Sequence, residues 1–401
     1  MSLAAPFRPI LRSPTLLLAA VLLVLFGAHA ATLAPYVSAL AVTVFGLSDR
    51  GFSVLLIVAS LVAVSGSVGL GIWADRHMRR RTVALGAIGF LTAGTALMAF
   101  APATPSFVLA HALLLPLSAS IFGQIFALAR LAATTLPEAE RVGVLSTLRA
   151  LFALPWVVVL PLWSVVFQGA TPLTVLYPVT LVFALAMAGL ALAFWPRDGA
   201  TPFADAPSGL SLGAALGEIA APRVLVRVLA LGAVNGAVYL YMVLIGLIFA
   251  ALPQRGAADT ALYAGLVAGL EVPFMLALPF IAGRISRQGL ILLGTALYAL
   301  HLAGLPLLAP GAAVWGLVLF AALGGALVLT QPMAYLQELM AERPGAGAAL
   351  MALQKLAGDG FTAAAFALGT TLSGYGLAAA LGAGASLAGA GVLFWLDRRA
   401  R

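Results

Sequence analysis

The chain has 401 residues, of which 63% are hydrophobic and 8% are charged, and its formal net charge is +8. Soluble domains carry roughly a quarter of their residues as charged side chains, so this composition excludes a soluble protein and indicates an integral membrane protein whose surface faces lipid. The positive charge does not indicate nucleic-acid binding, because the arginines are dispersed among short loops, as in membrane proteins. The absence of cysteine excludes disulfides, thiol catalysis and cysteine-ligated metals.

Long apolar runs divide the chain into predicted membrane spans. Each run is close to the roughly 20 residues that a helix needs to cross a bilayer, and none alternates like a barrel strand. Because lipid cannot satisfy exposed backbone groups, helices are the remaining solution. We therefore predict an all-α integral membrane protein with 12 transmembrane helices. In chain order the predicted spans are Ser13–Val42, Phe52–Ala74, Thr82–Ala101, Ser106–Thr134, Val142–Phe167, Leu173–Trp195, Val224–Leu252, Thr260–Gly283, Leu290–Ala309, Ala312–Leu339, Gly347–Ser373 and Leu377–Leu396.

The first span begins like a secretory signal. Arg8 and Arg12 precede an apolar run, and Ala28–Ala30 resembles a small-residue cleavage site. The apolar run continues past Ala30 to Val44, beyond the length of a signal peptide's apolar segment. We interpret it as an uncleaved first helix.

A polar stretch rich in Pro, Gly, Ala and Ser follows the sixth span, from Pro196 to Pro222. This composition is typical of a linker between two halves. We therefore predict three parts in the chain. They are an N-terminal six-helix bundle at residues 1–195, a cytoplasmic linker at 196–222 and a C-terminal six-helix bundle at 223–401.

The basic residues predict the orientation in the membrane. With the N-terminus placed in the cytoplasm, only Arg50 and Arg255 of the 21 Lys and Arg residues fall outside. Cytoplasmic loops carry an excess of Lys and Arg in membrane proteins. We therefore expect a multi-pass protein of a cell inner membrane with both termini in the cytoplasm.

The most highly charged segment is Gly71–Arg81, between the second and third spans. Five of its residues fit the loop signature Gly-x-x-x-Asp-Arg-x-Gly-Arg-Arg of the major facilitator superfamily: Gly71, Asp75, Arg76, Arg79 and Arg80. The chain therefore resembles this superfamily. The resemblance implies the major facilitator fold, in which two six-helix bundles expose a central site to each side in turn. We expect a gating role for this loop, with Asp75 as a latch for the outward-open state and Arg76, Arg79 and Arg80 in support.

Further stretches resemble one branch, the bacterial sugar efflux transporters. They are Gln124–Arg130, Gly269–Pro273 with Met275, Tyr335–Met340, and Arg149 with Trp156. The resemblance implies export of a sugar or sugar-like compound. The chain departs from that branch in its eleventh span, which carries Lys355 and Asp359 where we align an arginine. It also lacks the glycine-proline signature that many drug/proton antiporters carry in the fifth span.

Four ionisable or amide side chains lie far inside predicted spans. At about 1.5 Å per helical residue, Glu271, Lys355, Arg149 and Asn235 lie about 12–16 Å from the ends of their helices. A charged group at the centre of a bilayer costs at least about 2.5–3.5 kcal/mol. Each is therefore a functional candidate, and their similar depth is what a central cavity requires.

These patterns define three candidate sets. The proton-coupling candidates are Glu271 and, second, Asp359. The substrate-binding candidates are Arg149, Trp156, Asn235, Tyr239, Lys355, His29 and Gln124. Aromatic rings beside hydrogen-bonding groups suit a sugar, whose ring faces are apolar and whose hydroxyls need partners. The gating candidates are Asp75, Arg76, Arg79 and Arg80.

Structural interpretations remain open for several of these residues. Lys355 and Asp359 are four residues apart, so they could simply neutralise each other. Arg149 could pair with Glu271 or with backbone carbonyls. His29 is favoured as a packing residue over a proton carrier, and we interpret His111 and His301 as packing or interfacial residues.

We predict a secondary active transporter that exports a small hydrophilic solute, a sugar by preference, in exchange for protons. The alternative is a proton-coupled exporter of amphipathic drugs or metabolites. An enzyme is disfavoured because the four histidines are scattered and form no catalytic cluster. The expected partners are the solute, protons and membrane lipids, with no nucleic acid, no cofactor and no metal, and we expect a monomer.

Overall fold

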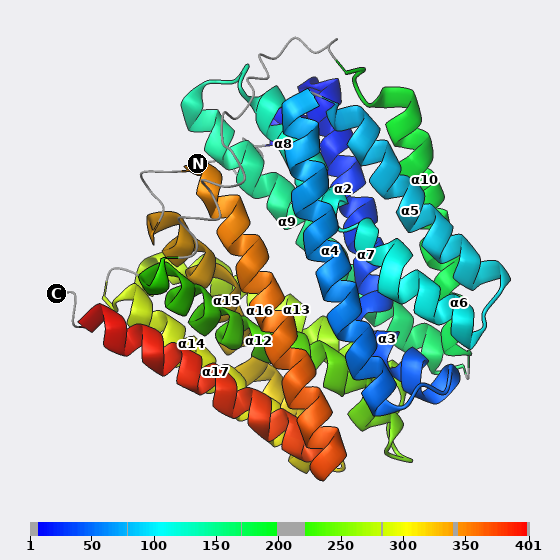
Figure 1. Cartoon of the computed structure of the whole chain (residues 1–401), viewed down its shortest axis with the longest axis vertical. Coiled ribbons are helices and arrows are strands. Elements are labelled where there is room, and N and C mark those ends of the chain that lie inside the picture. Colours follow the sequence, from blue (N-terminus) through cyan, green and yellow to red (C-terminus); the bar gives the residue numbers. More distant parts are fainter. Residues whose placement is uncertain are drawn as a thin grey trace. The chain divides into compact units, whose positions relative to one another are not determined.

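The structure is a computed structural model, and it describes residues 7–77, 79–169, 171–198, 221–281, 284–339 and 344–398. Within these residues the chain is almost entirely helical and contains no strand (Figure 1). The prediction of an all-α membrane protein is confirmed.

The first half of the chain forms six spans, of which the first and fourth are composite. The helices are α1 (Phe7–Arg12), α2 (Pro14–Leu33), α3 (Val37–Ala39), α4 (Asp49–His77), α5 (Arg80–Phe100), α6 (Thr104–Leu109), α7 (Leu115–Leu117), α8 (Ser120–Ala133), α9 (Glu138–Phe167) and α10 (Leu176–Phe194). Short irregular helices complete them: η1 (Ala34–Tyr36), η2 (Leu40–Val44), η3 (Ala110–Leu114) and η4 (Leu173–Val175).

The fourth predicted span is interrupted after α7. Pro116 lacks a backbone N–H, and the Ser118 backbone N–H bonds to the Leu115 carbonyl at 3.1 Å in a tighter turn. The Ser118 hydroxyl donates to the same carbonyl at 2.6 Å. The interruption therefore keeps its backbone groups paired although the helix does not continue.

The second half forms longer, more regular helices. They are α12 (Pro222–Ala250), α13 (Ala257–Ile281), α14 (Arg287–Leu308), η5 (Ala312–Gly316), α15 (Leu317–Leu339), α16 (Pro344–Leu372) and α17 (Tyr375–Arg398). Gly374, with φ of +116°, forms the turn between α16 and α17, where a side chain would be strained.

Eleven helical segments in the described part of the chain are long and apolar enough to cross a membrane. The remaining predicted span, the eleventh, corresponds to α16, a continuous helix of 29 residues that carries Lys355 and Asp359.

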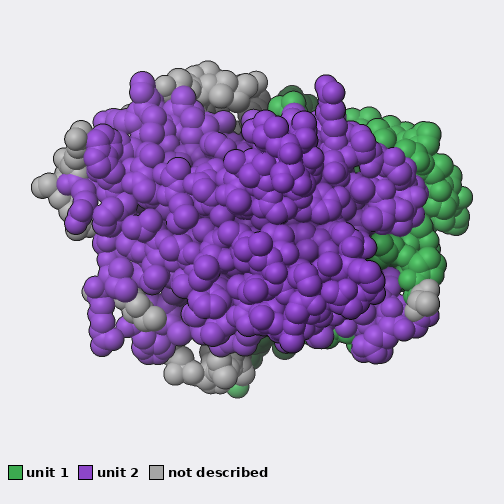
Figure 2. Space-filling view, turned by 90° about the horizontal axis from the view of Figure 1, so that it is seen from below, with its two compact units in different colours: residues 1–34, 61–162, 171–209 green, residues 35–60, 163–170, 210–401 purple. Residues whose placement is uncertain are grey.

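The chain forms two compact units, coloured separately in Figure 2. Unit 1 contains the described residues of 1–34, 61–162 and 171–209, and unit 2 contains those of 35–60, 163–170 and 210–401. Unit 2 therefore includes two short segments from the first half of the sequence. Most of the expected linker at 196–222 lies outside the described residues, and the division into two bundles at that linker stays a prediction.

Unit 1 has an apolar core between α2, α5, α8 and α10. Leu22 and Leu23 of α2, Ala87 of α5, Ile125 of α8 and Met187 of α10 are among its fully buried residues. Because the surrounding lipid is as apolar as this core, close packing rather than water exclusion holds such helices together. The polar side chains of α8 and α9 are exceptions to this apolar packing, so they are candidates for a functional role.

In unit 2, α12 packs closely against α16 and α17 (Figure 1). A Cβ at Gly236 would lie 3.1 Å from the Gly358 carbonyl oxygen, so the two backbones nearly touch there. The Thr362 hydroxyl donates to the Gly236 carbonyl at 3.0 Å. Small residues permit this approach, and it brings the polar face of α16 beside that of α12.

Candidate functional site

The polar face of α16 carries an ion pair. Lys355 and Asp359 lie one turn apart, and Lys355 Nζ is 2.7 Å from Asp359 Oδ2. Ser60 of α4 donates its hydroxyl to the same carboxylate oxygen at 2.6 Å. The Lys355 side chain is 50% exposed and that of Asp359 is 17% exposed. Asp359 is therefore fixed by two donors, whereas the ammonium group of Lys355 keeps free donor capacity.

The facing side of α12 contributes Tyr239 and Asn235. Lys355 Nζ lies 5.1 Å from the centre of the Tyr239 ring, a cation–π distance. A Cβ at Gly358 would lie 2.9 Å from Tyr239 Cε2, so the glycine makes room for that ring. Asn235 lies one turn before Tyr239, and its buried Oδ1 has no hydrogen-bond partner among the described residues. We call Ser60, Asn235, Tyr239, Lys355 and Asp359 the α16 cluster.

Glu271 lies on α13 and packs against a glycine of α15. Its Oε1 occupies the place where Gly325 would carry a Cβ, so any larger residue at position 325 would displace the carboxylate. The Tyr298 ring of α14 also borders this position, with its Cε2 3.4 Å from the Cβ that Gly325 lacks. We call the position bordered by Gly325 and Tyr298 the Glu271 notch. Within the described residues Glu271 forms no ion pair. The Glu271 carboxyl group therefore packs against Gly325 and lies beside the Tyr298 ring.

The predicted binding residues of the first half lie in unit 1. The Arg149 guanidinium lies 5.1 Å from the centre of the Phe126 ring. His29 and Gln124 are each 5% exposed, and His29 Nε2 and Gln124 Oε1 have no hydrogen-bond partner in the described part of the chain. Trp156 is partly buried on α9. Each unit gathers its own polar residues, and a single central site drawn from both halves stays a prediction.

The predicted gating loop is described only in part. The side chains of Asp75 and Arg76 lie outside the described residues, so the latch stays a prediction. Arg79 has a non-helical backbone just before α5, and its N–H donates to the Ala74 carbonyl at 3.3 Å. Arg80 is the first residue of α5.

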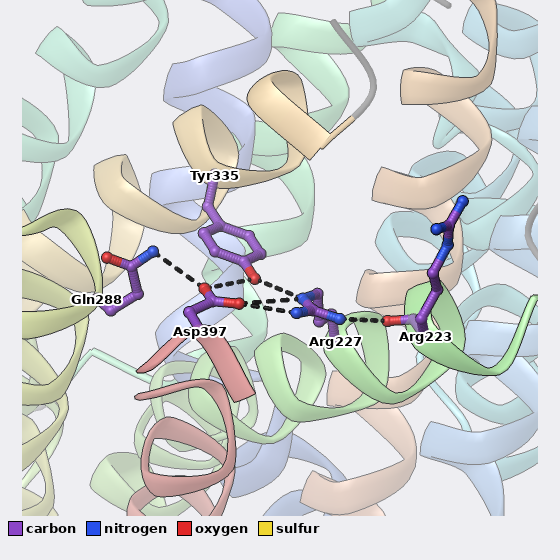
Figure 3. Close-up of polar contacts among 5 residues, drawn as sticks. All are labelled: Arg223, Arg227, Gln288, Tyr335 and Asp397. Atoms are coloured by element: carbon purple, nitrogen blue, oxygen red, sulfur yellow. Dashed lines mark hydrogen bonds and ion pairs between the residues drawn. The ribbon is translucent and has the colours of Figure 1, made fainter. Parts of the chain in front are cut away.

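A polar network at one end of unit 2 joins four helices (Figure 3). Asp397 of α17 accepts from Arg227 Nη2 of α12 at 2.8 Å and from Gln288 Nε2 of α14 at 3.0 Å. The Tyr335 hydroxyl of α15 donates to Asp397 at 2.9 Å and accepts from Arg227 Nε at 2.9 Å. Arg227 also bonds the Arg223 carbonyl at 2.9 Å. This Asp397 network ties the ends of α12, α14, α15 and α17.

Unit 1 contains a smaller counterpart after α10. Asp198 accepts from the backbone N–H of Arg81 at 2.8 Å and from the Thr82 hydroxyl at 3.0 Å. Arg81 in turn donates to the Trp195 and Leu192 carbonyls at 3.2 and 3.0 Å. A carboxylate at the first turn of α5 also complements the helix dipole. Each unit therefore has an aspartate near the end of the sixth helix of its half that binds the start of the third helix. Asp198 binds the start of α5, and Asp397 binds the start of α14.

A family model described as Major Facilitator Superfamily matches residues 20–383. The chain belongs to the major facilitator superfamily. The resemblance predicted from Gly71–Arg81 is confirmed, and with it a multi-pass transporter of small solutes rather than an enzyme.

Several relatives of this major facilitator protein are known. It is 28% identical over 396 residues to the "Putative sugar efflux transporter" of Deinococcus radiodurans, covering 94% of this chain and 96% of the relative. Among solved structures, the nucleoside transporter NupG matches with a TM-score of 0.74 at 12% identity, covering 95% of this chain and 98% of the other. A D-xylose-proton symporter matches with a TM-score of 0.68 at 16% identity, covering 93% and 96%. The structures show the shared fold, and the prediction of 12 helices in the major facilitator fold is confirmed.

Sequence reasoning missed several residues of these sites. Ser60 and Gly325 carry no charge, so depth and charge could not single them out. Asp397 and Asp198 could have been found from a repeat, because Phe394-Trp395 and Phe194-Trp195 precede them at the ends of the two halves. Internal repeats are typical of transporter folds, so this shared doublet could have directed attention to both acids.

Proposed function

We propose that this major facilitator protein exports a small hydrophilic solute, a sugar by preference, in exchange for protons by alternating access. The sugar class is supported by the relative from Deinococcus radiodurans and by the ring-and-charge chemistry of the α16 cluster. We place it in a cell inner membrane as a monomer with both termini in the cytoplasm, as the distribution of Lys and Arg favours.

The proposal of proton coupling rests on Glu271, as the residue that gains and loses the transported proton. Its carboxyl group lies on Gly325 beside Tyr298, and no Lys or Arg partner is seen for it among the described residues. An acid without a permanent cation can gain and lose a proton in each transport cycle. Asp359 is the weaker candidate, because it already pairs with Lys355 and accepts a hydrogen bond from Ser60.

The α16 cluster is the proposed half of the substrate site in unit 2. Tyr239 offers a ring face, and among the described residues Asn235 has an amide oxygen without a partner and Lys355 has N–H donors beyond its bond to Asp359. A sugar presents apolar faces and hydroxyls that both donate and accept. Arg149, Trp156, His29 and Gln124 are the proposed half in unit 1, and an aromatic ring beside polar groups recurs there.

The test of coupling is solute uptake into proteoliposomes with an imposed pH gradient. Radiolabelled mono- and disaccharides serve as probes. The wild type should accumulate a sugar in response to the gradient, and Glu271→Gln should lose that response while still exchanging labelled for unlabelled sugar. Asp198→Asn is the matched acid-to-amide control, because Asp198 binds Arg81 and Thr82 at the start of α5 in unit 1. A Glu271→Gln variant with full gradient-driven uptake would contradict the assignment.

The solute class is tested separately by heat protection in detergent. Sugars should raise the unfolding temperature of the wild type and leave that of Tyr239→Leu unchanged. Protection by hydrophobic cations and not by sugars would instead support the export of amphipathic compounds.

A further inference from the structure

A group of buried rings in unit 2 contains polar atoms that the structure leaves unpaired. Tyr241 of α12, Tyr263 of α13, and Tyr298 and His301 of α14 are each at most 1% exposed. The ring centre of His301 lies 4.9 Å from that of Tyr241, 5.1 Å from Tyr298 and 6.0 Å from Tyr263. We call these four residues the His301 cluster.

The unpaired atoms of this cluster are both ring nitrogens of His301 and the hydroxyl oxygens of Tyr241 and Tyr263. None of them has a hydrogen-bond partner within the described residues. A buried polar group left unpaired costs about 1–3 kcal/mol, so these four atoms, two of them on His301 itself, would be costly without a partner. Buried water commonly satisfies groups of this kind, since each water molecule makes about three hydrogen bonds.

The cluster touches the Glu271 notch at one side. The Tyr298 ring and the Glu271 carboxylate both border the position that a Cβ of Gly325 would occupy. Tyr298 also faces Tyr241, with ring centres 6.3 Å apart. The His301 cluster therefore adjoins, through Tyr298, the carboxyl group of Glu271, which is the proposed proton carrier.

At its other side the cluster reaches the end of unit 2 that carries Arg255. The Tyr263 ring lies 5.8 Å from that of Trp315 in η5, and the Arg255 guanidinium lies 5.4 Å from the Trp315 ring. Arg255 is held there by Asp259 at 3.1 Å and by the Gly311 carbonyl at 2.8 Å. This is the end that the positive-inside rule places outside the cell.

We propose that the His301 cluster is the route by which protons reach Glu271 from the Arg255 end of unit 2. This inference rests on the proposed role of Glu271 as proton carrier. His301 accepts a proton from a hydronium ion at one ring nitrogen, leaving a water molecule, and releases its other ring proton past Tyr298 to the Glu271 carboxylate, so one proton enters and one leaves. The groups that face Glu271 or His301 are Tyr241 from α12, Tyr263 from α13, Tyr298 from α14 and Gly325 from α15.

The experiment measures how fast Glu271 is protonated, without any solute. Reconstituted full-length protein is taken through an alkaline-to-acid pH jump, and time-resolved infrared spectroscopy follows the carboxyl band that is absent in Glu271→Gln. In His301→Leu the rise of this band should slow by about tenfold, the factor for about 1.4 kcal/mol in a barrier. Tyr241→Phe and Tyr263→Phe, which each remove one oxygen and keep the ring, should slow it as well.

The matched control is the other buried histidine–tyrosine pair, in unit 1. His111 Nε2 lies 3.0 Å from the Tyr177 hydroxyl oxygen, and the double variant His111→Leu/Tyr177→Phe should leave the rate unchanged. If His301→Leu does not fold, the double variant Tyr241→Phe/Tyr263→Phe decides. Protonation at the wild-type rate would overturn the route alone, whereas a wild type with no Glu271-dependent band would overturn the carrier role and the proposed function.

Discussion

Ser60 donates its hydroxyl to Asp359 Oδ2 at 2.6 Å, across 299 residues of sequence. The bond joins α4 to α16 within unit 2, and it gives the acid a second donor besides Lys355. A contact between helices from opposite halves of the sequence must open if the halves separate at this end during alternating access. The Ser60 hydroxyl therefore supports the ion pair, and under the proposed mechanism its bond to Asp359 would break in each cycle.

Replacing Ser60 with Ala should destabilise this state of the protein by about 1 kcal/mol, the net contribution of a typical hydrogen bond. Thermal unfolding in detergent measures the loss. Ser53→Ala is the control on the same helix, since the Ser53 hydroxyl bonds only the local Asp49 carbonyl at 2.8 Å. Equal effects of the two variants would mean that the bond to Asp359 contributes nothing particular.

Tyr239→Leu should weaken the hold on Lys355 and lower sugar affinity, because it removes a cation–π contact of about 0.5–2 kcal/mol. Tyr239→Phe keeps the ring and should stay close to the wild type. Sugar titration by intrinsic fluorescence separates the two. A Phe variant as weak as the Leu variant would show that the hydroxyl, not the ring face, matters.

Gly325→Ala should weaken proton coupling, though less than Glu271→Gln does, because the new methyl group would displace the Glu271 carboxylate oxygen from its place. Gradient-driven uptake is the measurement, with sugar exchange as the reference activity. Gly391→Ala in α17 is the control, since nothing lies within 4 Å of its Cβ position. Normal coupling in Gly325→Ala would argue against the notch as a determinant of Glu271 position.

Asp397→Asn should cost about 2–4 kcal/mol, because it leaves the partly buried Arg227 without its anion. Asp198→Asn should cost less, about 0.5–1 kcal/mol, since its contacts are exposed and lie at a helix N-terminus. Thermal unfolding of both variants in parallel tests this order. An equal loss of stability in both variants would contradict the larger contribution assigned to Asp397.

Much of the architecture could be predicted from the sequence because lipid imposes strong rules. Apolar runs about 20 residues long must be helices in a bilayer, and the charges at Asp75–Arg81 must lie at a surface. The interruption after α7 was harder to foresee, because Pro116 is tolerated inside many membrane helices. Only the local bonds of Ser118 reveal that the helix breaks there.

The candidate site could be predicted in part. Depth and charge indicated Glu271, Lys355 and Asp359, since charged groups are rare in membrane helices. The same criteria passed over the glycine that holds Glu271 and interpreted His301 as a packing residue. Helix-to-helix geometry decides such roles, and a single sequence does not encode it in any local pattern.

Proton movement driven by solute efflux tests the central claim most directly. Proteoliposomes are loaded with the sugar that best protects the protein against heating and with a pH-sensitive dye, and are then diluted into sugar-free buffer. An antiporter takes up protons as sugar leaves, so the lumen should acidify with the wild type and remain at constant pH with Glu271→Gln. A lumen that becomes alkaline, as with a symporter, or one that does not change with the wild type would contradict proton antiport.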